Sequence, residues 1–339
     1  MILAGDIGGT NARLALFSAR DGALLQVKET VFPSRQHSGL DQIVAKFVAQ
    51  EKPILEAACF GIAGPVVNGR CETSNLPWVV ESTQLARELD LPQVLLINDL
   101  EANAWGIGGL AGDDLVSLNQ IGLNSSATAP QTQPSGNQAV VSAGTGLGEA
   151  GLYWDGERHH VFACEGGHTD FAPRNDLEMQ LLQYLVARFG HVSYERILSG
   201  PGLVNVFSFL RDTGHGRPDA WLVEEMEKSD PAAAISKAAL QGKCELCEQA
   251  LELFISIYGA EAGNMALKVM ATGGIFLGGG IAPKILARLK GPLFMDAFRG
   301  KGRMQRLLES IPVSVIVNDK TALLGAARCA QAKLALVIA

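Results

Sequence analysis

A glycine-rich turn between two apolar strands occurs twice in this chain, and the repeat limits the possible folds more than any other feature. The first copy, DIGGTN at residues 6–11, separates the apolar N-terminal run from a second apolar run at 12–17. The second copy, GTGLG at residues 144–148, follows the apolar run 139–143 and leads into a strand pattern that ends at Trp154. An Asp-Gly pair, typical of a tight turn, and a third apolar run follow in both places. The sequence therefore predicts two related lobes, each built on strand–turn–strand hairpins.

Both turns offer backbone N–H groups to which phosphate oxygens can bind. Glycine carries no Cβ, so an anion can approach the backbone closely, and Thr10 and Asn11 can donate further hydrogen bonds. Asp6, at the end of the first strand, can hold the Mg²⁺ that neutralises nucleotide phosphates, directly or through water. If the glycine turn occurred only once, a tight hairpin that needs glycine for its dihedral angles would be the simpler explanation. The repeat, together with a glycine turn at 278–280 that can lie against an adenine ring, favours a nucleotide site.

Two other nucleotide-binding motifs are excluded. Residues 146–151 fit the spacing of the dinucleotide fingerprint GxGxxG, but that fingerprint opens a helix, and here a strand and an Asp-Gly turn follow. The P-loop pattern GxxxxGK[ST] does not occur in the sequence. Phosphate binding is therefore predicted for the hairpins.

The charge balance argues against a nucleic-acid partner, because phosphate contacts need clustered Lys and Arg. The chain has 28 Lys and Arg against 35 Asp and Glu, a net charge of −7, and no basic run. Glycine or charged residues interrupt every apolar run before it reaches the length of a membrane span. Because a strand and its turn begin at the N-terminus, we expect no signal peptide and a cytoplasmic location.

The six cysteines are scattered, and in a chain of this size we expect them to be reduced. Cys244 and Cys247 form a CxxC, but they lie in a helical apolar pattern with no second ligand pair nearby. A structural role on a helix face is therefore favoured over zinc binding or redox chemistry.

The first lobe alternates strand and helix patterns. An amphipathic helix is predicted after the first hairpins, then a buried strand at 57–63 and a short helix that Ser82 can cap. The apolar run 94–97 is typical of a central strand covered on both faces, and it ends in an Asn-Asp pair at 98–99 before another helix. The same order of strand, Asn-Asp pair and helix closes the chain from residue 313 onward. We expect this last helix to return to the first lobe.

The second lobe is predicted to be mainly helical beyond its hairpins. The polar segment 122–138 indicates a surface loop ahead of them. Asn175, with Glu178 at the capping-box position, predicts the start of a helix. Long helices are predicted within 231–270, and Pro283 suits the first turn of another.

Two carboxylates compete for the role of general base in phosphoryl transfer to an alcohol. Asp99 follows the run 94–97, at the carboxyl end of a strand, where ligands of open α/β sheets gather. Its neighbour Asn98 can orient the substrate or the carboxylate. Asp99 can equally be the N-cap of the next helix, and Asp319 has the same local context. The residues alone leave this choice open.

A second polar cluster, EGGHTDFAP from Glu165 onward, suits the recognition of a polyhydroxylated ligand. Glu165 and His168 flank two glycines and Asp170 follows, on a segment with little helix or strand pattern. A site of buried polar groups rejects analogues that leave those groups unpaired. The alternatives are a surface turn or a metal site, which the lack of a second histidine nearby weakens. Glu195 and Asn75 are weaker candidates for the same ligand.

Several motifs resemble the bacterial glucokinase family, in the hexokinase and actin-like ATPase superfamily. In chain order they are GDIGGTNARLAL, LIND, SAGTGLG, EGGHTDFAP, ERILSGPGLVN, GGIFLGGGIAPK and KGRM, and together they cover essentially the whole chain. The resemblance implies phosphorylation of glucose by ATP at the 6-hydroxyl, with Mg²⁺ as cofactor, and a homodimer. It also implies the α/β class and a two-domain actin-like ATPase (ribonuclease H-like) fold. A small α/β domain, residues 1–109 and 314–339, and a larger α+β domain, residues 110–313, would close on glucose.

By motif position, the resemblance makes Asp99 the general base and Asn98 its sugar-binding neighbour, which decides against Asp319. Other side chains would bind the sugar hydroxyls: Asn75, Glu165, His168 and Glu195. The nucleotide would contact residues of three glycine turns: Gly5, Asp6, Ile7, Gly8, Gly9, Thr10, Asn11, Thr145, Gly146, Gly278 and Gly279. The related repressor and kinase branch carries a cysteine-rich zinc motif after the EGGH histidine. This chain has no such cysteines there, so structural zinc is not expected.

Two other functions are compatible with this scaffold. A sugar-responsive repressor would need basic charge and a DNA-binding helix-turn-helix ahead of the first glycine turn, where only five residues precede Asp6. An actin-like nucleotide switch would not require Asp99 together with the cluster at Glu165 and His168. The sequence therefore favours the kinase.

Overall fold

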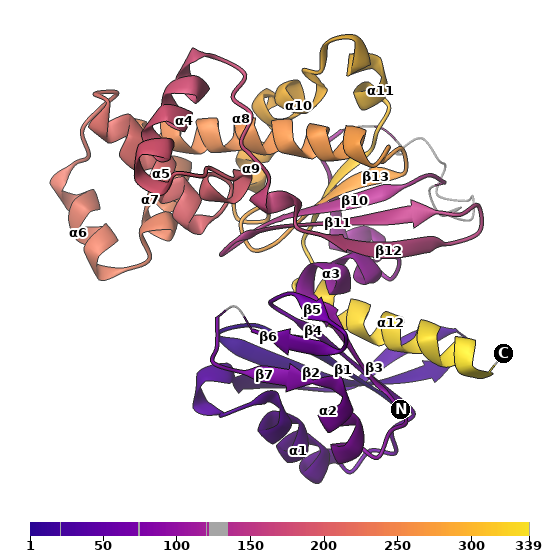
Figure 1. Cartoon of the computed structure of the whole chain (residues 1–339). Coiled ribbons are helices and arrows are strands. Elements are labelled where there is room, and N and C mark those ends of the chain that lie inside the picture. The colour runs from indigo at the N-terminus through magenta and orange to yellow at the C-terminus, as the bar shows by residue number, and fades with distance from the viewer. Residues whose placement is uncertain (21, 74, 120, 122–134, 339) are drawn as a thin grey trace. The chain divides into compact units, whose positions relative to one another are not determined.

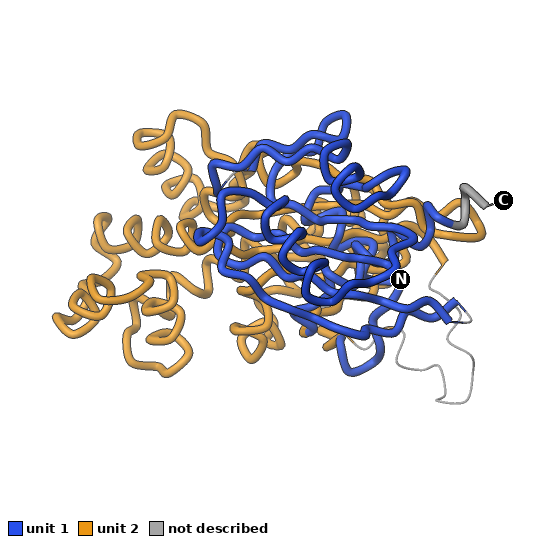
Figure 2. The backbone as a smooth tube through the Cα atoms, turned by 90° about the horizontal axis from the view of Figure 1, so that it is seen from below, with its two compact units in different colours: residues 1–114, 318–339 blue, residues 115–317 orange. Residues whose placement is uncertain are grey.

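The chain divides into two compact units, which Figure 2 shows in different colours. Unit 1 comprises residues 1–114 and 318–339, and unit 2 comprises residues 115–317. The predicted domain division after residues 109 and 313 stays a prediction. The computed structural model (Figure 1) describes residues 1–20, 22–73, 75–119, 121 and 135–338. Most of the predicted polar loop at 122–138, and Asp21 of the first Asp-Gly turn, lie outside the described residues.

Unit 1 is built on a five-stranded mixed sheet with the strand order β3-β2-β1-β4-β8. Its strands are β1 (Ile2–Ile7), β2 (Asn11–Arg20), β3 (Ala23–Pro33), β4 (Ala57–Ile62) and β8 (Val94–Asn98). The first three form the predicted antiparallel hairpins, β4 runs parallel to β1, and β8 runs parallel to β4. A second, three-stranded sheet consists of β5 (Val66–Val67), β6 (Arg70–Glu72) and β7 (Val79–Glu81).

Helices cover both faces of the five-stranded sheet. On one face lie α1 (Leu40–Glu51), whose Phe47 is fully buried in the core, and α2 (Ser82–Glu88). On the other face lie α3 (Asp99–Ile107) and α12 (Thr321–Ile338), which pack on each other and on β1 and β4. Gly325 of α12 lies directly against the carbonyl group of Ala102 in α3, a contact that only a residue without a Cβ allows. The last helix therefore returns to the first lobe, as predicted (Figure 1).

Unit 2 repeats this five-strand topology and adds a sixth strand, antiparallel to β14, giving the order β12-β11-β10-β13-β14-β9. Its strands are β9 (Leu115–Ser117), β10 (Gln138–Ala143), β11 (Leu147–Trp154), β12 (His159–Cys164), β13 (Gly274–Gly278) and β14 (Val313–Ile316). Strands β10, β11 and β12 form the second set of hairpins, and β13 and β14 continue the sheet in parallel with β10. Two lobes with one shared topology confirm the predicted α/β, two-domain actin-like fold.

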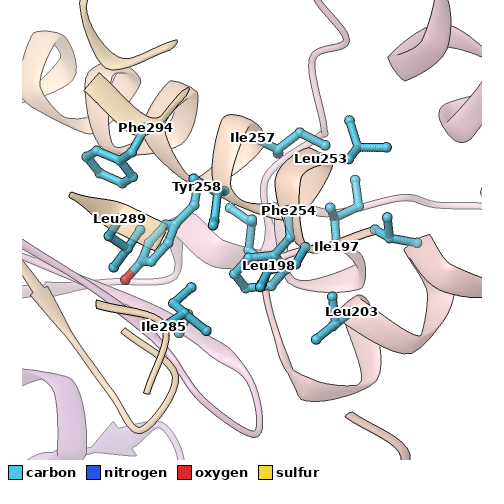
Figure 3. Packing of buried hydrophobic residues seen from close by; sticks show 14 of the residues in the cluster. Ile197, Leu198, Leu203, Leu253, Phe254, Ile257, Tyr258, Ile285, Leu289 and Phe294 are labelled. Atoms are coloured by element: carbon cyan, nitrogen blue, oxygen red, sulfur yellow. The ribbon is translucent and has the colours of Figure 1, made fainter. Parts of the chain in front are cut away.

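Helices supply most of the remaining mass of unit 2. They are α4 (Asp176–Phe189), α5 (Gly200–Asp212), α6 (Ala220–Lys228), α7 (Pro231–Leu240), α8 (Glu245–Lys268), α9 (Leu286–Leu289), α10 (Pro292–Arg299) and α11 (Gln305–Glu309). Helix α8 runs through the core, where Tyr258 packs edge-on against Phe294 with ring centroids 5.7 Å apart (Figure 3). The buried Tyr258 hydroxyl donates to the Val141 carbonyl at 2.9 Å and so ties α8 to β10. Among the described helices, none is both long and apolar enough to span a membrane.

Local helix signals had mixed success. The predicted helix start is confirmed, because the Asn175 side chain accepts a hydrogen bond from the Glu178 N–H at 3.0 Å at the start of α4. The Glu178 carboxylate accepts in turn from the Arg174 N–H at 2.8 Å. The prediction that Ser82 caps α2 was wrong, since Ser82 is already the first helical residue. The prediction for Pro283 was also wrong. It lies in the turns after β13, and α9 begins only at Leu286.

The position of β8 corrects another prediction. Val94 and Leu96 join the core on the α1 face, while Ile97 joins the core on the α12 face, so both faces are covered as expected. However, β8 is the last strand of the five-stranded sheet rather than a central one. An apolar run reports that helices cover both faces of a strand, and it does not report whether a further strand pairs with its edge.

Candidate functional site

The first glycine turn connects β1 to β2 and is held in place by Ser34, a buried residue directly after β3. The Ser34 hydroxyl donates to the Gly8 carbonyl at 2.8 Å, and the Ser34 N–H donates to the Thr10 carbonyl at 2.9 Å. Within the turn, the Gly8 N–H donates to the Asn11 carbonyl at 3.0 Å. These bonds fix the backbone that the sequence predicts to bind phosphate.

The glycines of this segment serve different purposes. A Cβ on Gly5 would lie 2.4 Å from a ring carbon of Phe60, so packing inside the sheet explains glycine there, and the neighbouring Ile7 is buried. A Cβ on Gly9 would lie 2.7 Å from the Cβ of Asn75. The structure thus brings Asn75 beside the first turn, in a small pocket that both residues line.

Asp6 lies near the carboxyl end of β1 in a largely buried environment. Burial raises the pKa of its carboxyl group, the positive charge of Arg13 lowers it, and the negative charge of Asp319 raises it. Arg13 is engaged with Asp319, whose carboxylate lies 2.9 Å from the guanidinium and is 73% exposed. A divalent cation would stabilise the ionised form of Asp6.

The fit of Mg²⁺ to this position can be judged from its coordination habits. Among the described residues, no group of three or more His, Cys, Asp or Glu is arranged to hold a metal ion. Mg²⁺ in kinases does not need such a group, because one or two carboxylates, waters and the substrate phosphates complete its shell. Asp6, beside a phosphate-binding turn, supplies a ligand of the required kind.

Asn98 and Asp99 lie where β8 meets α3, at the same sheet edge as Asp6. Strand pairing sets this alignment, with Asp6 opposite Gly61 of β4 and Asn98 opposite Ile62. The Asn98 side chain accepts from the Leu100 N–H at 2.8 Å and donates to a backbone carbonyl at 3.0 Å. Asn98 is therefore the N-cap of α3, and Asp99 is its half-buried first residue. The Asp99 carboxylate shares the Leu100 donor at 3.0 Å.

The second glycine turn, at residues 144–148 in unit 2, is held in place by hydrogen bonds to two other segments. Within the turn the Gly144 N–H donates to the Gly146 carbonyl at 2.8 Å, and the Gly144 carbonyl accepts from the Gly200 N–H at 2.8 Å. The Ala143 carbonyl accepts from the Ile281 N–H at 3.1 Å, which joins this turn to the one after β13. Thr145 is exposed at the apex.

The turn after β13 meets the second glycine turn because β10 and β13 are parallel neighbours and end together. Ser142 pairs with Gly278, which is buried, and exposed Gly279 follows. Gly279 has a φ of +77° and lies against the Ala143 backbone. After the second glycine turn the chain continues as strand β11 and not as a helix, which confirms that the GxGxxG match at 146–151 is accidental.

The EGGH segment forms a single 3₁₀ turn, Gly166–His168, at the end of β12. The His168 N–H donates to the Glu165 carbonyl at 3.0 Å, and Gly167 packs on the Leu147 carbonyl. The His168 Nε2 lies 3.9 Å from a Glu165 carboxylate oxygen, and the two side chains are 59% and 68% exposed. Both side chains can therefore reach a ligand from one turn.

Glu195 is brought beside this turn by a short antiparallel contact. The Phe171 N–H donates to the Val192 carbonyl at 2.9 Å, and the Tyr194 N–H donates to the Thr169 carbonyl at 3.1 Å. Glu195 follows at once, and one of its carboxylate oxygens accepts from the Leu147 N–H at 2.9 Å. The same oxygen lies next to Gly146.

Asp170, the third polar residue of the EGGH cluster, is paired with a residue outside the cluster. Its carboxylate is 91% exposed and lies 2.9 Å from the His191 Nε2. Sequence reasoning missed two other acidic residues of unit 2, Glu149 on β11 and Glu261 on α8, which are fully buried. No local pattern marks them, because their significance comes from elements that are distant in sequence.

Comparison with known proteins gives a consistent result. A family model described as Glucokinase matches residues 3–333. The chain is 43% identical to a glucokinase of Nostoc sp. over 346 residues, covering 97% of this chain and 98% of that protein. A solved glucokinase from an Antarctic psychrotroph is 32% identical, with a TM-score of 0.82 and 98% of both chains covered. A glucokinase from Balamuthia mandrillaris, solved in complex with glucose, is 24% identical and shares the fold with a TM-score of 0.79, covering 97% of this chain and 93% of that one.

Proposed function

Because the chain belongs to the glucokinase family and phosphorylates glucose with ATP, we propose that Asp99 is the general base of this reaction. In the proposed step, a bond forms between glucose O6 and the γ-phosphorus, the bond to the ADP oxygen breaks, and Asp99 takes the hydroxyl proton. The observation that carries this proposal is that Asp99 directly follows β8, at the sheet edge where Asp6 also lies. Ligands of open α/β sheets gather at the carboxyl ends of such strands.

We propose that the nucleotide is bound by backbone groups of the glycine turns. The turn from Gly8 to Asn11, and Thr145 with Gly146, would contact phosphate oxygens, while Gly278 and Gly279 would contact the adenosine. The support is geometric, since each turn is fixed by hydrogen bonds to a neighbouring segment. Mg²⁺, held by Asp6, would neutralise the phosphate charge.

We propose that Glu165, His168 and Glu195 bind sugar hydroxyls, with Asn98 and Asn75 as further contacts. Carboxylates accept hydrogen bonds from hydroxyl groups, and an imidazole or amide can donate or accept. The 3₁₀ turn that carries Glu165 and His168, and the strand contact that brings Glu195 beside it, support a common ligand for the three. A polyhydroxylated ligand would satisfy all of them.

We propose a cytoplasmic location and a homodimer for the protein. The requirement for ATP supports the first proposal, because ATP is supplied inside cells. The second is an expectation from the family, and molecular mass in solution would test it.

The experiment that tests the proposed base compares Asp99→Asn with Asp319→Asn. Asp99→Asn should keep its affinity for glucose, measured by calorimetry, and lose at least about 100-fold in kcat, which is the usual contribution of a general base. Asp319→Asn should lose far less, since Asp319 is exposed and paired with Arg13. Glucose 6-phosphate and ADP are measured separately in each case. Near-normal turnover by Asp99→Asn, or a greater loss in Asp319→Asn, would refute the assignment.

A further inference from the structure

Two fully buried glutamates of unit 2 interact electrostatically, and one of them, Glu149, touches the EGGH turn. Glu149 on β11 is 1% exposed and Glu261 on α8 is 0% exposed. Glu261 is well satisfied, since its two carboxylate oxygens lie 3.1 Å from the Lys268 ammonium and 2.8 Å from the Asn264 amide. Neither carboxylate oxygen of Glu149 has a hydrogen-bond partner among the described residues. Glu261 therefore has partners that stabilise its ionised form, whereas the Glu149 carboxyl group has none among the described residues.

A proton on Glu149 would resolve this difference. An ionised carboxylate without a donor is costly in the interior, and more so beside a second carboxylate. Burial raises the pKa of Glu149, the negative charge of Glu261 raises it further, and Lys268 only partly offsets them, so that the pKa is about 8. A protonated Glu149 becomes a donor, and Glu261 is the acceptor beside it.

Glu149 also touches the turn that carries the candidate sugar ligands. A Cβ on Gly166 would overlap one Glu149 carboxylate oxygen and would lie 2.8 Å from the carboxyl carbon. Glu149 pairs in register with Cys164, the residue before Glu165. The backbone of the turn therefore packs against the Glu149 carboxyl group. A change in the charge or size of this group should therefore displace the backbone of the turn.

We propose that Glu149 is a positioning residue for sugar binding, which shares one proton with Glu261 and supports the Gly166–His168 turn in the geometry that presents Glu165 and His168. The proposal rests on the proposed sugar-binding role of this turn. It assigns Glu149 no contact with substrate and no part in the transfer step itself.

The proposal makes the affinity for glucose depend on pH in one direction. The ionisable groups that face Glu149 are Glu261, Lys268 and Tyr258 from α8 and Cys164 from β12. When Glu149 loses its proton, two negative charges face each other, and the Lys268 ammonium offsets their repulsion only in part. The folded state holds this proton more tightly than the unfolded chain does, so the support is intact at low pH and is lost as pH rises through the raised pKa.

The experiment uses Glu149→Gln and Glu149→Ala with the full-length protein. The Gln amide mimics the protonated acid, so its KM for glucose at pH 7 should lie within about twofold of wild type. Between pH 7 and 9 the wild-type KM should rise several-fold, while that of Glu149→Gln should stay flat. Glu149→Ala should raise KM for glucose at least about tenfold at every pH, with KM for ATP nearly unchanged.

Glu178→Gln is the matched control. Glu178 is equally buried, but its carboxylate lies 2.5 Å from the Arg174 guanidinium, so its ionised form is the satisfied one. This variant should lose melting temperature and keep the wild-type pH profile for glucose. If Glu149→Gln is as impaired as Glu149→Ala, or if its KM rises with pH in parallel with wild type, the proposal is overturned. Glu149→Gln decides the outcome even if Glu149→Ala fails to fold.

If the EGGH turn does not bind sugar at all, the result would differ from a failure of the positioning role of Glu149. If His168→Ala and Glu165→Gln leave KM for glucose unchanged, the turn does not bind sugar, and the positioning proposal falls with it. Proton sharing is tested independently by melting temperature. The advantage of Glu149→Gln over wild type should grow from pH 6 to pH 9, and an advantage that is constant or shrinks contradicts the shared proton.

Discussion

The proposed contact of Gly279 with the nucleotide leads to a prediction whose magnitude follows from the structure. Gly279 has a φ of +77°, and a Cβ there would lie 2.3 Å from the Ala143 carbonyl oxygen and 2.8 Å from its carbonyl carbon. Ordinary carbon–oxygen contacts are about 3.3 Å or longer. Gly279→Ala must therefore move one of two joined backbone segments by about 1 Å. These are backbone atoms, so no side chain can swing aside.

The energetic cost has two parts. An alanine in a left-handed conformation costs about 1 kcal/mol, and forced overlap with packed backbone adds about 1–3 kcal/mol. We therefore expect Gly279→Ala to lose about 2–4 kcal/mol of stability, or roughly 5–15 °C in melting temperature for a unit of this size. Because a displacement of about 1 Å can cost up to about 100-fold in a positioned reaction, KM for ATP should rise at least tenfold.

Gly280→Ala is the control for this prediction. A Cβ on Gly280 has no heavy atom within 4 Å, so the added methyl displaces nothing. Its melting temperature should stay within about 2 °C of wild type. Any change in its KM for ATP reports the effect of an added methyl group without displacement of the backbone. Both variants are assayed for ADP and glucose 6-phosphate with each substrate varied, beside thermal melts. If Gly279→Ala matches Gly280→Ala in melting temperature and in KM for ATP, the reasoning is refuted.

Two further substitutions test other parts of the site. Asp6→Asn should raise the melting temperature at pH 7 and lower kcat at least about tenfold. Burial and Asp319 raise the pKa of Asp6 above 3.8, so the folded state loses stability as pH rises through that pKa, and Asn does not titrate. Thermal melts and steady-state rates check the two effects: an unchanged kcat would contradict the metal role, and an unchanged melting temperature would contradict the cost of the buried charge. Glu195→Ala should raise KM for both substrates, because the Leu147 N–H loses its acceptor, whereas Glu195→Gln retains an acceptor oxygen and should lose less. Steady-state kinetics with each substrate varied measures both constants. A rise in KM for glucose alone, with KM for ATP unchanged, would contradict this prediction.

The features that could be predicted from the sequence are those with local causes. The hairpins at 6–11 and 144–148 follow from glycine turns between apolar strands, and both formed. The start of α4 follows from Asn175 and Glu178, whose hydrogen bonds span three residues. The return of the last helix was predictable because its pattern repeats the strand and helix that end the first lobe.

The features that escaped prediction depend on residues that are distant in sequence. Nothing in the run 94–97 reveals that, among the described residues, no further strand pairs with the outer edge of β8. Asn98 and Asp99 are equally good caps by type, and Asn98 is the N-cap because its backbone is extended and α3 begins at Asp99. Glu149 reads as one polar residue in a strand until Glu261, from α8, is found beside it.

In unit 2, the first three residues of β11 connect the proposed nucleotide groups with the proposed sugar groups. The Leu147 N–H donates to Glu195, and the Leu147 carbonyl packs on Gly167. Two residues later, Glu149 supports Gly166. This segment pairs with β10 along its whole length and with β12 from Glu149 onward, so it cannot shift without moving β10. A ligand that orders the turn at Thr145 therefore also restrains the segment on which the sugar turn rests. Coupling of this kind is reciprocal, so if ATP tightens glucose binding by some factor, glucose must tighten ATP binding by the same factor.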